Sequence, residues 1–275
     1  MRTLGITTAN RTPAVAPPPN AIAGKPFFDD FAGASIDPLK WTVYNRLGDW
    51  GNSEINCIVP GDVAVSSGTL KITSKFEDHV CGDTIIAPAT KNYTSGQVAQ
   101  ATQPFLYGTV SVRAKIAGGT GLWPCIWMLG YLWQPSQPYT ANTPEHQWPR
   151  QGWCEIDIAE FMNNARTSVN CQIHYDPTSD GSATVHPGSS QALPFDATTR
   201  FMVYRFIWSA GSAIWQVDAE DGSGFRTLQT VTGSANVPNV PMYLVLHTAI
   251  GGIGGGTPNP ATFPQTMEID YAQIS

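Results

Sequence analysis

The sequence predicts an all-β protein, a β-jelly-roll sandwich of two antiparallel sheets with one concave face. The first reason is composition: 26 Gly, 22 Pro and only 13% charged residues in a chain of 275 leave little material for amphipathic helices. The second is a series of short runs that alternate apolar and polar residues between turn-forming residues. The third is that no segment keeps a 3.6-residue apolar period long enough for a substantial helix. Such spacing is typical of sandwiches and jelly rolls.

The chain divides into a tail and one domain. Residues 1–26 are rich in Ala, Pro, Thr and Asn and contain Pro17-Pro18-Pro19, which predicts an extended tail or linker. Residues 27–275 are long enough for a single large β domain with its own core. We expect this domain to be a monomer.

The strands are expected in the following order. One hairpin covers 63–75 with its turn at 66–69, and a second covers 201–217 with its turn at 209–212. Further strands are expected at 96–100, 108–117, 121–129, 154–162, 168–175, 242–250 and 267–274.

Two longer loops are expected at 131–152 and 176–199. Both carry aromatic residues, prolines and histidines. Loops of this length in a compact domain often form walls of a binding site.

The charge and hydropathy exclude two classes of partner. A net charge of −6 and a pI near 5.3 provide no electrostatic footprint for nucleic acid or anionic lipid. No run of about 18 apolar residues is present, so we expect no membrane span. The first residues, 1–5, lack the apolar stretch of a signal peptide.

Five cysteines, an odd number, leave at least one thiol free or paired with another chain. Cys57 and Cys81 flank a strand-like stretch, so a disulfide between them is one alternative. Cys125 and Cys154 lie in apolar strand patterns, where buried free thiols are ordinary. The absence of a Cys-x-x-Cys pair argues against a zinc ribbon or a redox motif.

The segment 153–162 concentrates acidic residues. In a regular strand, Glu155 and Asp157 share one face while the isoleucines that alternate with them point into the core. Glu160 would then lie on the apolar face, where an ionised carboxylate is costly to bury. A β-bulge near 158–159 returns Glu160 to the face of the other two acids, and bulges are enriched beside active sites.

Three carboxylates on one stretch of strand have a chemical use. Like charges a few ångströms apart raise at least one pKa, so that one acid keeps a proton near neutral pH. A retaining glycosidase needs one carboxylate to attack the anomeric carbon and a protonated one, about 5–5.5 Å away, to protonate the leaving oxygen. Asp157, between the two glutamates, would balance the charge and orient the nucleophile.

Three other interpretations compete. The acids could form a solvated face, with Arg150 and Arg166 as the cations nearest in sequence. They could form a metal site together with His174. They could also form a lectin-like site that binds sugar without cleaving it.

Several motifs together resemble glycoside hydrolase family 16, in particular its laminarinase-like members with a bulged acidic strand. The family motif of Glu, apolar, Asp, two apolar residues and Glu is matched by 155–160, Glu-Ile-Asp-Ile-Ala-Glu. Further similar segments follow in the family's order and cover most of 27–275: Tyr93-Thr94-Ser95-Gly96, Tyr107-Gly108, Arg113-Ala114-Lys115, 121–130, 242–246, 249–252, Phe263-Pro264-Gln265 and Glu268-Ile269-Asp270-Tyr271.

The resemblance implies a role for each matching residue of the acidic strand. Glu155 would be the nucleophile, Glu160 the general acid/base and Asp157 the supporting carboxylate. Trp123 and Trp127 would stack on sugars beside the point of cleavage, with core packing as the alternative.

The resemblance also implies further contacts at the edges of the cleft. His174, on one face with Gln172, would lie near the acid/base, with a purely structural histidine as the alternative. Trp148 or Trp153 would supply another sugar platform. No cofactor is expected for catalysis. A structural calcium is implied on the opposite face, with Asp270 as its ligand and Asp29 or Asp30 as partners.

Three positions depart from the family pattern. Gln97 stands where Arg is usual, His247 stands where Asn is common, and Ile253 stands where Trp often follows two glycines. These changes leave the acidic residues intact. They fall at positions that are expected to bind substrate.

The expected activity is therefore that of a retaining endo-β-glycanase with an open cleft, in particular an endo-β-1,3-glucanase (laminarinase-like). The alternatives are a hydrolase of an algal galactan such as agarose or carrageenan, and a non-catalytic glucan-binding module on the same fold. The partner is a polysaccharide substrate, and the family resemblance implies an extracellular or periplasmic location.

Overall fold

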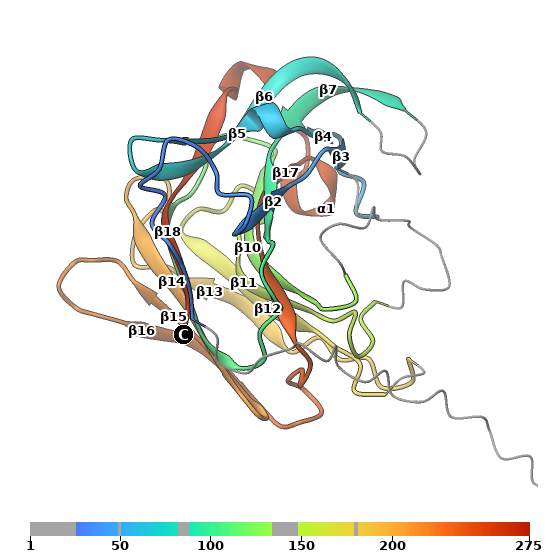
Figure 1. Cartoon of the computed structure of the whole chain (residues 1–275), viewed down its shortest axis with the longest axis vertical. Helices are drawn as coiled ribbons and strands as arrows, with labels where there is room; N and C mark the ends of the chain where they lie inside the picture. The colour runs from blue at the N-terminus through green and yellow to red at the C-terminus, as the bar shows by residue number, and fades with distance from the viewer. Residues whose placement is uncertain (1–25, 49–50, 82–87, 134–147, 179–180) are drawn as a thin grey trace, which may run out of the picture.

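The computed structural model describes residues 26–48, 51–81, 88–133, 148–178 and 181–275 (Figure 1). Its strands are β1 (Phe27–Asp29), β2 (Trp41–Val43), β3 (Arg46–Leu47), β4 (Cys57–Ile58), β5 (Val63–Ser66), β6 (Thr69–Cys81), β7 (Ala89–Ser95), β8 (Gln97–Gln100), β9 (Gly108–Lys115), β10 (Leu122–Gly130), β11 (Glu155–Glu160), β12 (Ser168–His174), β13 (Gly188–Ala192), β14 (Met202–Ser209), β15 (Ser212–Asp218), β16 (Arg226–Thr232), β17 (Met242–Ile250) and β18 (Gln265–Ile274). Helical turns are limited, among these residues, to η1 (Pro60–Asp62), α1 (Gly252–Gly255) and η2 (Pro260–Thr262).

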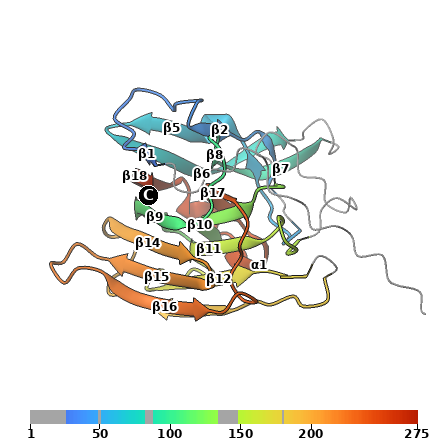
Figure 2. The ribbon, with the colours of Figure 1, turned by 60° about the horizontal axis from the view of Figure 1, so that its bottom comes forward.

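The described strands form two sheets, which confirms the predicted sandwich. The larger, called here the back sheet, has eleven strands, with β16-β15-β14-β9-β18-β6-β7-β4-β3 as its main order. Figure 2 shows this series from β5 and β6 through β18, β9, β14 and β15 to β16. The smaller, called here the cleft sheet, has seven strands in the order β13-β12-β11-β10-β17-β8-β2. Pairing within the cleft sheet is antiparallel throughout.

Most predicted elements are confirmed. The strand at 242–250 begins and ends as expected, and both hairpins turn at the predicted residues. Gly68 and Gly211, each with a positive φ, provide a left-handed residue in each of these two turns. One prediction was partly wrong, because the expected loop 176–199 contains β13, which adds to the edge of the cleft sheet.

Two predicted segments lie mostly outside the described residues. The tail at 1–26 is described only at Pro26, and the loop at 131–152 only at its two ends. Within the described part of the chain, no helix is long and apolar enough to cross a membrane.

The core lies between the two sheets and is built from alternate residues of the strands. Its largest fully buried side chains include Trp41, Trp208, Trp215, Phe161 and Phe206. Burial of an aromatic side chain of this kind stabilises the fold by about 1.5–3 kcal/mol. The charged and polar residues of β11 therefore project from the other face of the cleft sheet, away from this core.

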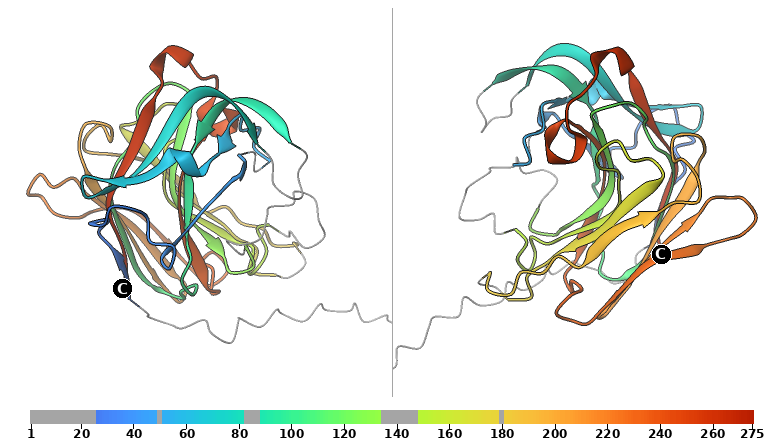
Figure 3. Two further views of the ribbon diagram at one scale, coloured as in Figure 1. Left: turned by 45° about the horizontal axis from the view of Figure 1, so that its top comes forward. Right: turned by 180° about the vertical axis from the view of Figure 1, so that it is seen from behind.

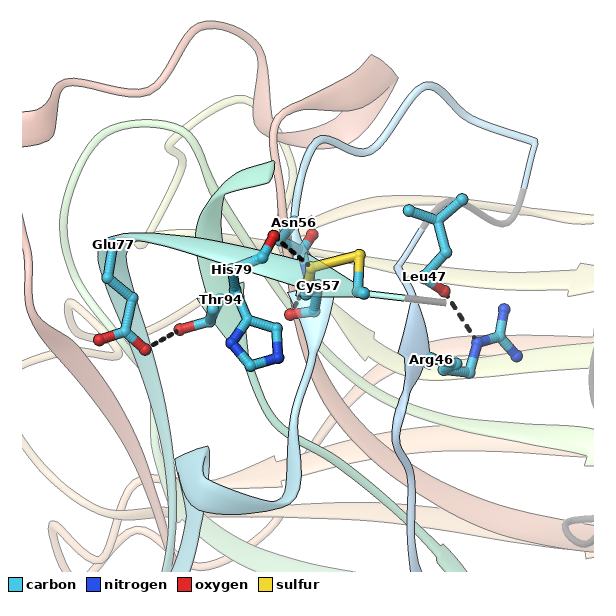
Figure 4. Close-up of a disulfide and its surroundings, with 8 residues drawn as sticks. Arg46, Leu47, Asn56, Cys57, Glu77, His79 and Thr94 are labelled. Carbon is cyan, nitrogen blue, oxygen red and sulfur yellow. Dashed lines mark hydrogen bonds between the residues drawn. A yellow bond between two sulfur atoms is a disulfide. The ribbon is translucent and has the colours of Figure 1, made fainter. Parts of the chain in front are cut away.

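A disulfide joins Cys57 in β4 to Cys81 at the end of β6 (Figure 4). It resolves the alternatives for these two cysteines, while Cys125, Cys154 and Cys171 are buried free thiols. Residues 52–56, just before Cys57, dock on the end of β17, where the Ile55 amide donates to the Ile250 carbonyl at 2.9 Å. The disulfide thus tethers the chain that forms one wall of the cleft described below.

The predicted bulge in β11 is confirmed. On β10 the step from Ile126 to Trp127 is matched on β11 by a step from Ala159 to Asp157, so Ile158 is the extra residue. The register of β11 against β12 shifts at the same place. The extra residue returns the next acid along β11 to the face of the first two, as the sequence required.

A core tryptophan of the back sheet supports the bulge. The indole of Trp215 in β15, which is fully buried, donates to the main-chain carbonyl of Asp157 at 2.8 Å. A buried carbonyl without a partner is costly, so this bond stabilises the irregular backbone where the strand changes register.

Candidate active site

A cleft of about 480 Å³ lies on the outer face of the cleft sheet. Its floor comes from β10, β11, β12 and β17, and one wall comes from residues 51–54. Glu155, Asp157 and Glu160 all line it, so the structure brings together the three acids selected from the sequence.

Glu155 lies half-buried at the start of β11. The indole of Trp148 donates to Glu155 Oε2 at 3.1 Å, and this ring is 44% exposed at the mouth of the cleft. The same indole lies 5.2 Å from the imidazole of His174, which is opposite Glu155 on β12. Trp148 therefore holds one oxygen of Glu155 and leaves the other for a further contact.

Asp157 is the most buried of the three acids, with 3% exposure. Its Oδ2 lies 3.4 Å from His174 Nε2 and has no hydrogen-bond partner among the described residues. Trp127 is its neighbour on β10. Asp157 thus sits between the two glutamates and beside the imidazole of His174.

Glu160 carries a donor on each carboxylate oxygen. The indole of Trp123 donates to Oε1 at 2.9 Å, and the amide of Asn170 donates to Oε2 at 2.6 Å. The acid is 9% exposed. Sequence reasoning missed Asn170, although it lies on the same face of β12 as Gln172 and His174 and is paired with Glu160.

Burial dominates the electrostatics of the three acids. It raises the pKa of Glu155 from 4.5 to about 8, helped by the charge of Asp157 and opposed by His174 and the Trp148 donor. Burial, with the charge of Glu160, raises the pKa of Asp157 well above its usual range. Burial also raises the pKa of Glu160, against the two donors that favour its ionised form. The group therefore retains protons at neutral pH.

The tryptophans selected from the sequence have different environments. Trp123 and Trp127 line the cleft but are 6% and 8% exposed. Trp123 is covered by Gly254 of α1, the short helical turn drawn in red in Figure 3, where any side chain would collide with the indole. Its position is therefore set to donate to the acid in β11 more than to offer an open ring face.

Trp153 is the predicted platform that does not reach the cleft. It packs edge-on against Trp133, with ring centres 5.3 Å apart, and its carbonyl accepts the Trp133 indole at 2.9 Å. Trp133 lines the cleft instead. The sequence placed an aromatic residue in this loop, but only the fold decides which of two indoles faces the cleft.

The cations nearest in sequence do not neutralise the acids. The guanidinium of Arg166 is turned away, donating to the carbonyls of Ala117 and Leu122 at 3.0 and 3.1 Å. The described residues that line the cleft include no Lys or Arg. The solvated, charge-paired face considered from the sequence is therefore not what the fold forms.

The metal-site alternative was also considered from the sequence. One oxygen of Glu155, one oxygen of Asp157 and one ring nitrogen of His174 lie within 4.8 Å of one another. Among the described residues, this is the group of acids and histidine close enough together to hold a metal ion. One Glu155 oxygen is already engaged by an indole donor.

The expected calcium ligand has another partner. The carboxylate of Asp270 lies 3.1 Å from the guanidinium of Arg113. Asp29 accepts the Trp41 indole at 2.8 Å and lies 3.2 Å from Lys40. A cation already beside Asp270 and Asp29 disfavours a second one, so these two carboxylates do not fit a calcium site.

Two of the three positions that depart from the family pattern are adjacent in the fold. His247 lines the cleft, and Gln97 is its neighbour on β8. Burial, with the charge of Arg46, lowers the pKa of His247 to about 3, so the imidazole is neutral. Glu54 and Asn52, which the sequence did not single out, also line this end, and Glu54 accepts from the amide of Asn52.

Comparison with known proteins extends the similarity beyond the acidic strand. The family model described as "Glycosyl hydrolases family 16" matches residues 52–273. The chain is 30% identical to the glucan endo-1,3-beta-glucosidase A1 of Niallia circulans, over 92% of this chain and 38% of that protein. It is 27% identical to a beta-glucanase of Rhodothermus marinus, over 89% of this chain and 82% of that protein.

A solved structure is also similar. A LamA variant from Zobellia galactanivorans, in complex with laminaritriose and laminaritetraose, has a TM-score of 0.76 and 29% identity, covering 90% of this chain and 97% of that chain. The family model spans most of this chain and includes the bulged acidic strand, as the motifs predicted. The protein therefore belongs to family 16 of the glycosyl hydrolases.

Proposed function

We propose that this protein is a retaining endo-β-1,3-glucanase that uses Glu155 as nucleophile and Glu160 as general acid/base. The main support is that a single bulge places both glutamates and Asp157 in one cleft, where each glutamate accepts a hydrogen bond from an indole. Trp148 fixes Glu155 and Trp123 fixes Glu160, so two carboxyl groups of separate function are oriented before substrate arrives.

The reaction then follows the double-displacement route. The Glu155 carboxylate attacks the anomeric carbon while Glu160 gives its proton to the leaving oxygen, which forms a glycosyl–enzyme ester on Glu155. Glu160, now ionised, takes a proton from water, and the resulting attack on the ester releases the sugar and restores both acids. Asp157 supports the nucleophile from the same face.

The protons belong to the interacting acids as a group. The reactive form has Glu155 ionised and Glu160 protonated. In that form the Trp148 N–H faces the negative oxygen of Glu155, and the burial of Glu160 favours its protonated state. The later ionised state of Glu160 is stabilised by Trp123 and Asn170.

A neutral glucan is the substrate class that the cleft supports best. Four acids line it, Glu54 in addition to the reactive three, while its described lining holds no Lys or Arg. A sulfated galactan would meet uncompensated negative charge there. The relatives named as β-1,3-glucanases and the LamA complex with laminari-oligosaccharides support a β-1,3-glucan in particular.

Two other functions have their own tests. A binding module needs no proton donor, so the oriented pair of glutamates argues for turnover. A metal-dependent enzyme would lose its rate on exhaustive chelation, whereas we expect the rate to be unchanged, because the acids and donors described above supply the chemistry.

The decisive experiment measures the release of reducing ends from laminarin, curdlan, mixed-linkage glucan, xyloglucan, agarose and carrageenan. Wild type and Glu155→Gln are run side by side, with circular dichroism to show that both are folded. Activity on laminarin or curdlan that the variant lacks supports the proposal. Activity on agarose alone would show that the substrate is a galactan instead of a glucan. A folded but inactive wild type would favour the binding module.

We also infer that the protein works in an oxidising compartment, extracellular or periplasmic. The Cys57–Cys81 disulfide supports this location, because such bonds persist mainly outside reducing cytosol. An alkylation assay on protein from the native host, with and without reductant, tests it: two thiols that react only after reduction are expected.

A further inference from the structure

His186 is brought to the rim of the cleft by the backbone of residues 185–188. Val185 and Tyr175 exchange main-chain hydrogen bonds, and the carbonyl of Pro187 accepts from the Ile173 amide at 3.0 Å. Gly188 allows the two main chains to approach closely, because a side chain there would collide with the carbonyl of Cys171. These contacts extend the pairing of β13 with β12 and place His186 beside His174.

The two imidazoles form a hydrogen bond through like atoms. His174 Nδ1 lies 2.7 Å from His186 Nδ1, and the ring centres are 4.9 Å apart. One proton lies between two such nitrogens, because one must donate and the other accept. His174 Nε2 faces the buried carboxyl of Asp157, whose pKa burial raises well above its usual range. A protonated Asp157 donates to Nε2, so the proton of a neutral His174 lies on Nδ1, which donates to His186 Nδ1.

A second contact holds the main chain of His186 in place. The side-chain amide of Gln172, which lines the cleft, donates to the His186 carbonyl at 2.5 Å. The indole of Trp148 lies 6.0 Å from the His186 ring and 5.2 Å from the His174 ring. His186 is therefore positioned by both β12 and the aromatic wall that holds the nucleophile.

We propose that His186 is a positioning residue that keeps the proton of His174 on Nδ1 and so directs Nε2 at Asp157. This inference rests on the proposed function of the acidic strand. His186 need not touch substrate, since it acts through His174.

The tautomer of His174 affects the charge of the neighbouring acids. His174 Nε2 faces Asp157 at 3.4 Å and shares its surroundings with Glu155 and Glu160, which are the titratable groups that β11 presents to it. With Nδ1 protonated, Nε2 of a neutral imidazole can accept a hydrogen bond from the protonated carboxyl of Asp157, which favours the uncharged form of that acid. If the proton moved to Nε2, the imidazole would donate to Asp157 and favour its ionised form, which adds negative charge beside both glutamates.

The test compares two variants of an exposed residue. His186→Asn retains an acceptor, because Asn Oδ1 occupies nearly the position of His Nδ1. His186→Phe retains the ring but has no acceptor. We expect the Phe variant to lose about 3- to 10-fold in kcat, as for one hydrogen bond, with KM unchanged, and the acidic limb of its pH profile to move to higher pH. The Asn variant should retain wild-type kcat and profile.

A second measurement does not depend on turnover. Long-range ¹H–¹⁵N spectra of histidine-labelled protein, recorded from pH 6 to 9, report which nitrogen of His174 is protonated. We expect Nδ1–H in the neutral imidazole of wild type and of His186→Asn, and Nε2–H in His186→Phe.

Each outcome has a defined meaning. The proposal is overturned if wild-type His174 is an Nε2–H tautomer, if the Phe variant has wild-type kcat and profile, or if the Asn variant is as impaired as the Phe variant. If wild type cleaves no glucan, the proposed function fails, and the tautomer spectra still decide the role of His186.

Discussion

Replacing Glu155, the proposed nucleophile, by glutamine should make the protein more stable, by an amount that increases with pH. The pKa of Glu155 is raised from 4.5 to about 8 in the fold, mainly by burial. A carboxyl whose folded pKa is raised contributes its full stability below pH 4.5 and loses it as the pH rises through 8. Glu155→Gln removes this carboxyl and retains an oxygen that accepts the Trp148 indole N–H. The variant therefore does not lose stability at this position as the pH rises.

The magnitude follows from the difference of about 3.5 in pKa. At about 1.36 kcal/mol per pKa unit, the ceiling is about 4.8 kcal/mol well above pH 8, with about 3.3 kcal/mol at pH 7 and about 0.8 kcal/mol at pH 5. Water in the open cleft screens Glu155, and Asp157 shares the protons, so we expect about 1–3 kcal/mol at pH 8. For a domain of this size, each kcal/mol raises Tm by about 2–4 °C.

The assay is thermal unfolding followed by circular dichroism, from pH 5 to 9 at constant ionic strength. Glu220→Gln is the control of opposite sign, because the hydrogen bond from Arg113 lowers the pKa of Glu220 and its charge therefore stabilises the fold above pH 4.5. The control should be less stable than wild type over the whole range. A Glu155→Gln advantage that is absent, or that falls between pH 5 and 8, would refute the reasoning.

Three further predictions concern the groups around the acids. Glu160→Ala should lose activity on polymer but recover on an activated aryl glycoside with azide, measured as glycosyl azide formation; a folded variant without rescue would contradict its acid/base role. Asn170→Ala removes a donor that lowers the pKa of Glu160, so the alkaline limb of kcat/KM should move to higher pH, and an unmoved limb would sink this assignment. Trp215→Phe leaves the Asp157 carbonyl unpaired, so urea unfolding should show a loss of about 1–3 kcal/mol together with a lower kcat; a loss of stability with unchanged kcat would separate the bulge from catalysis.

The acidic strand is the part of the site that could be predicted from sequence. Alternation along a strand is a local property, and it placed Glu155 and Asp157 on one face and Glu160 on the other. The cost of burying an ionised acid then required a bulge, and the register of β10 with β11 confirms it. The hairpins were predictable for the same reason, since turn residues such as Gly68 act locally.

The partners of these acids were decided by the tertiary structure. Asn170 reaches Glu160 and His186 reaches His174 only because β12 and the segment before β13 pair in a particular register. Trp215 reaches the bulge from the other sheet, across 58 residues of chain.

The same holds for the aromatic wall and the tether. The choice of Trp133 over Trp153 at the cleft, and the pairing of Cys57 with Cys81, depend on how distant segments pack. The sequence alone determined which side chains share a face, because that follows from the two-residue period of one strand. The fold determined which groups meet across strands, because register and packing between sheets are set by the whole core at once.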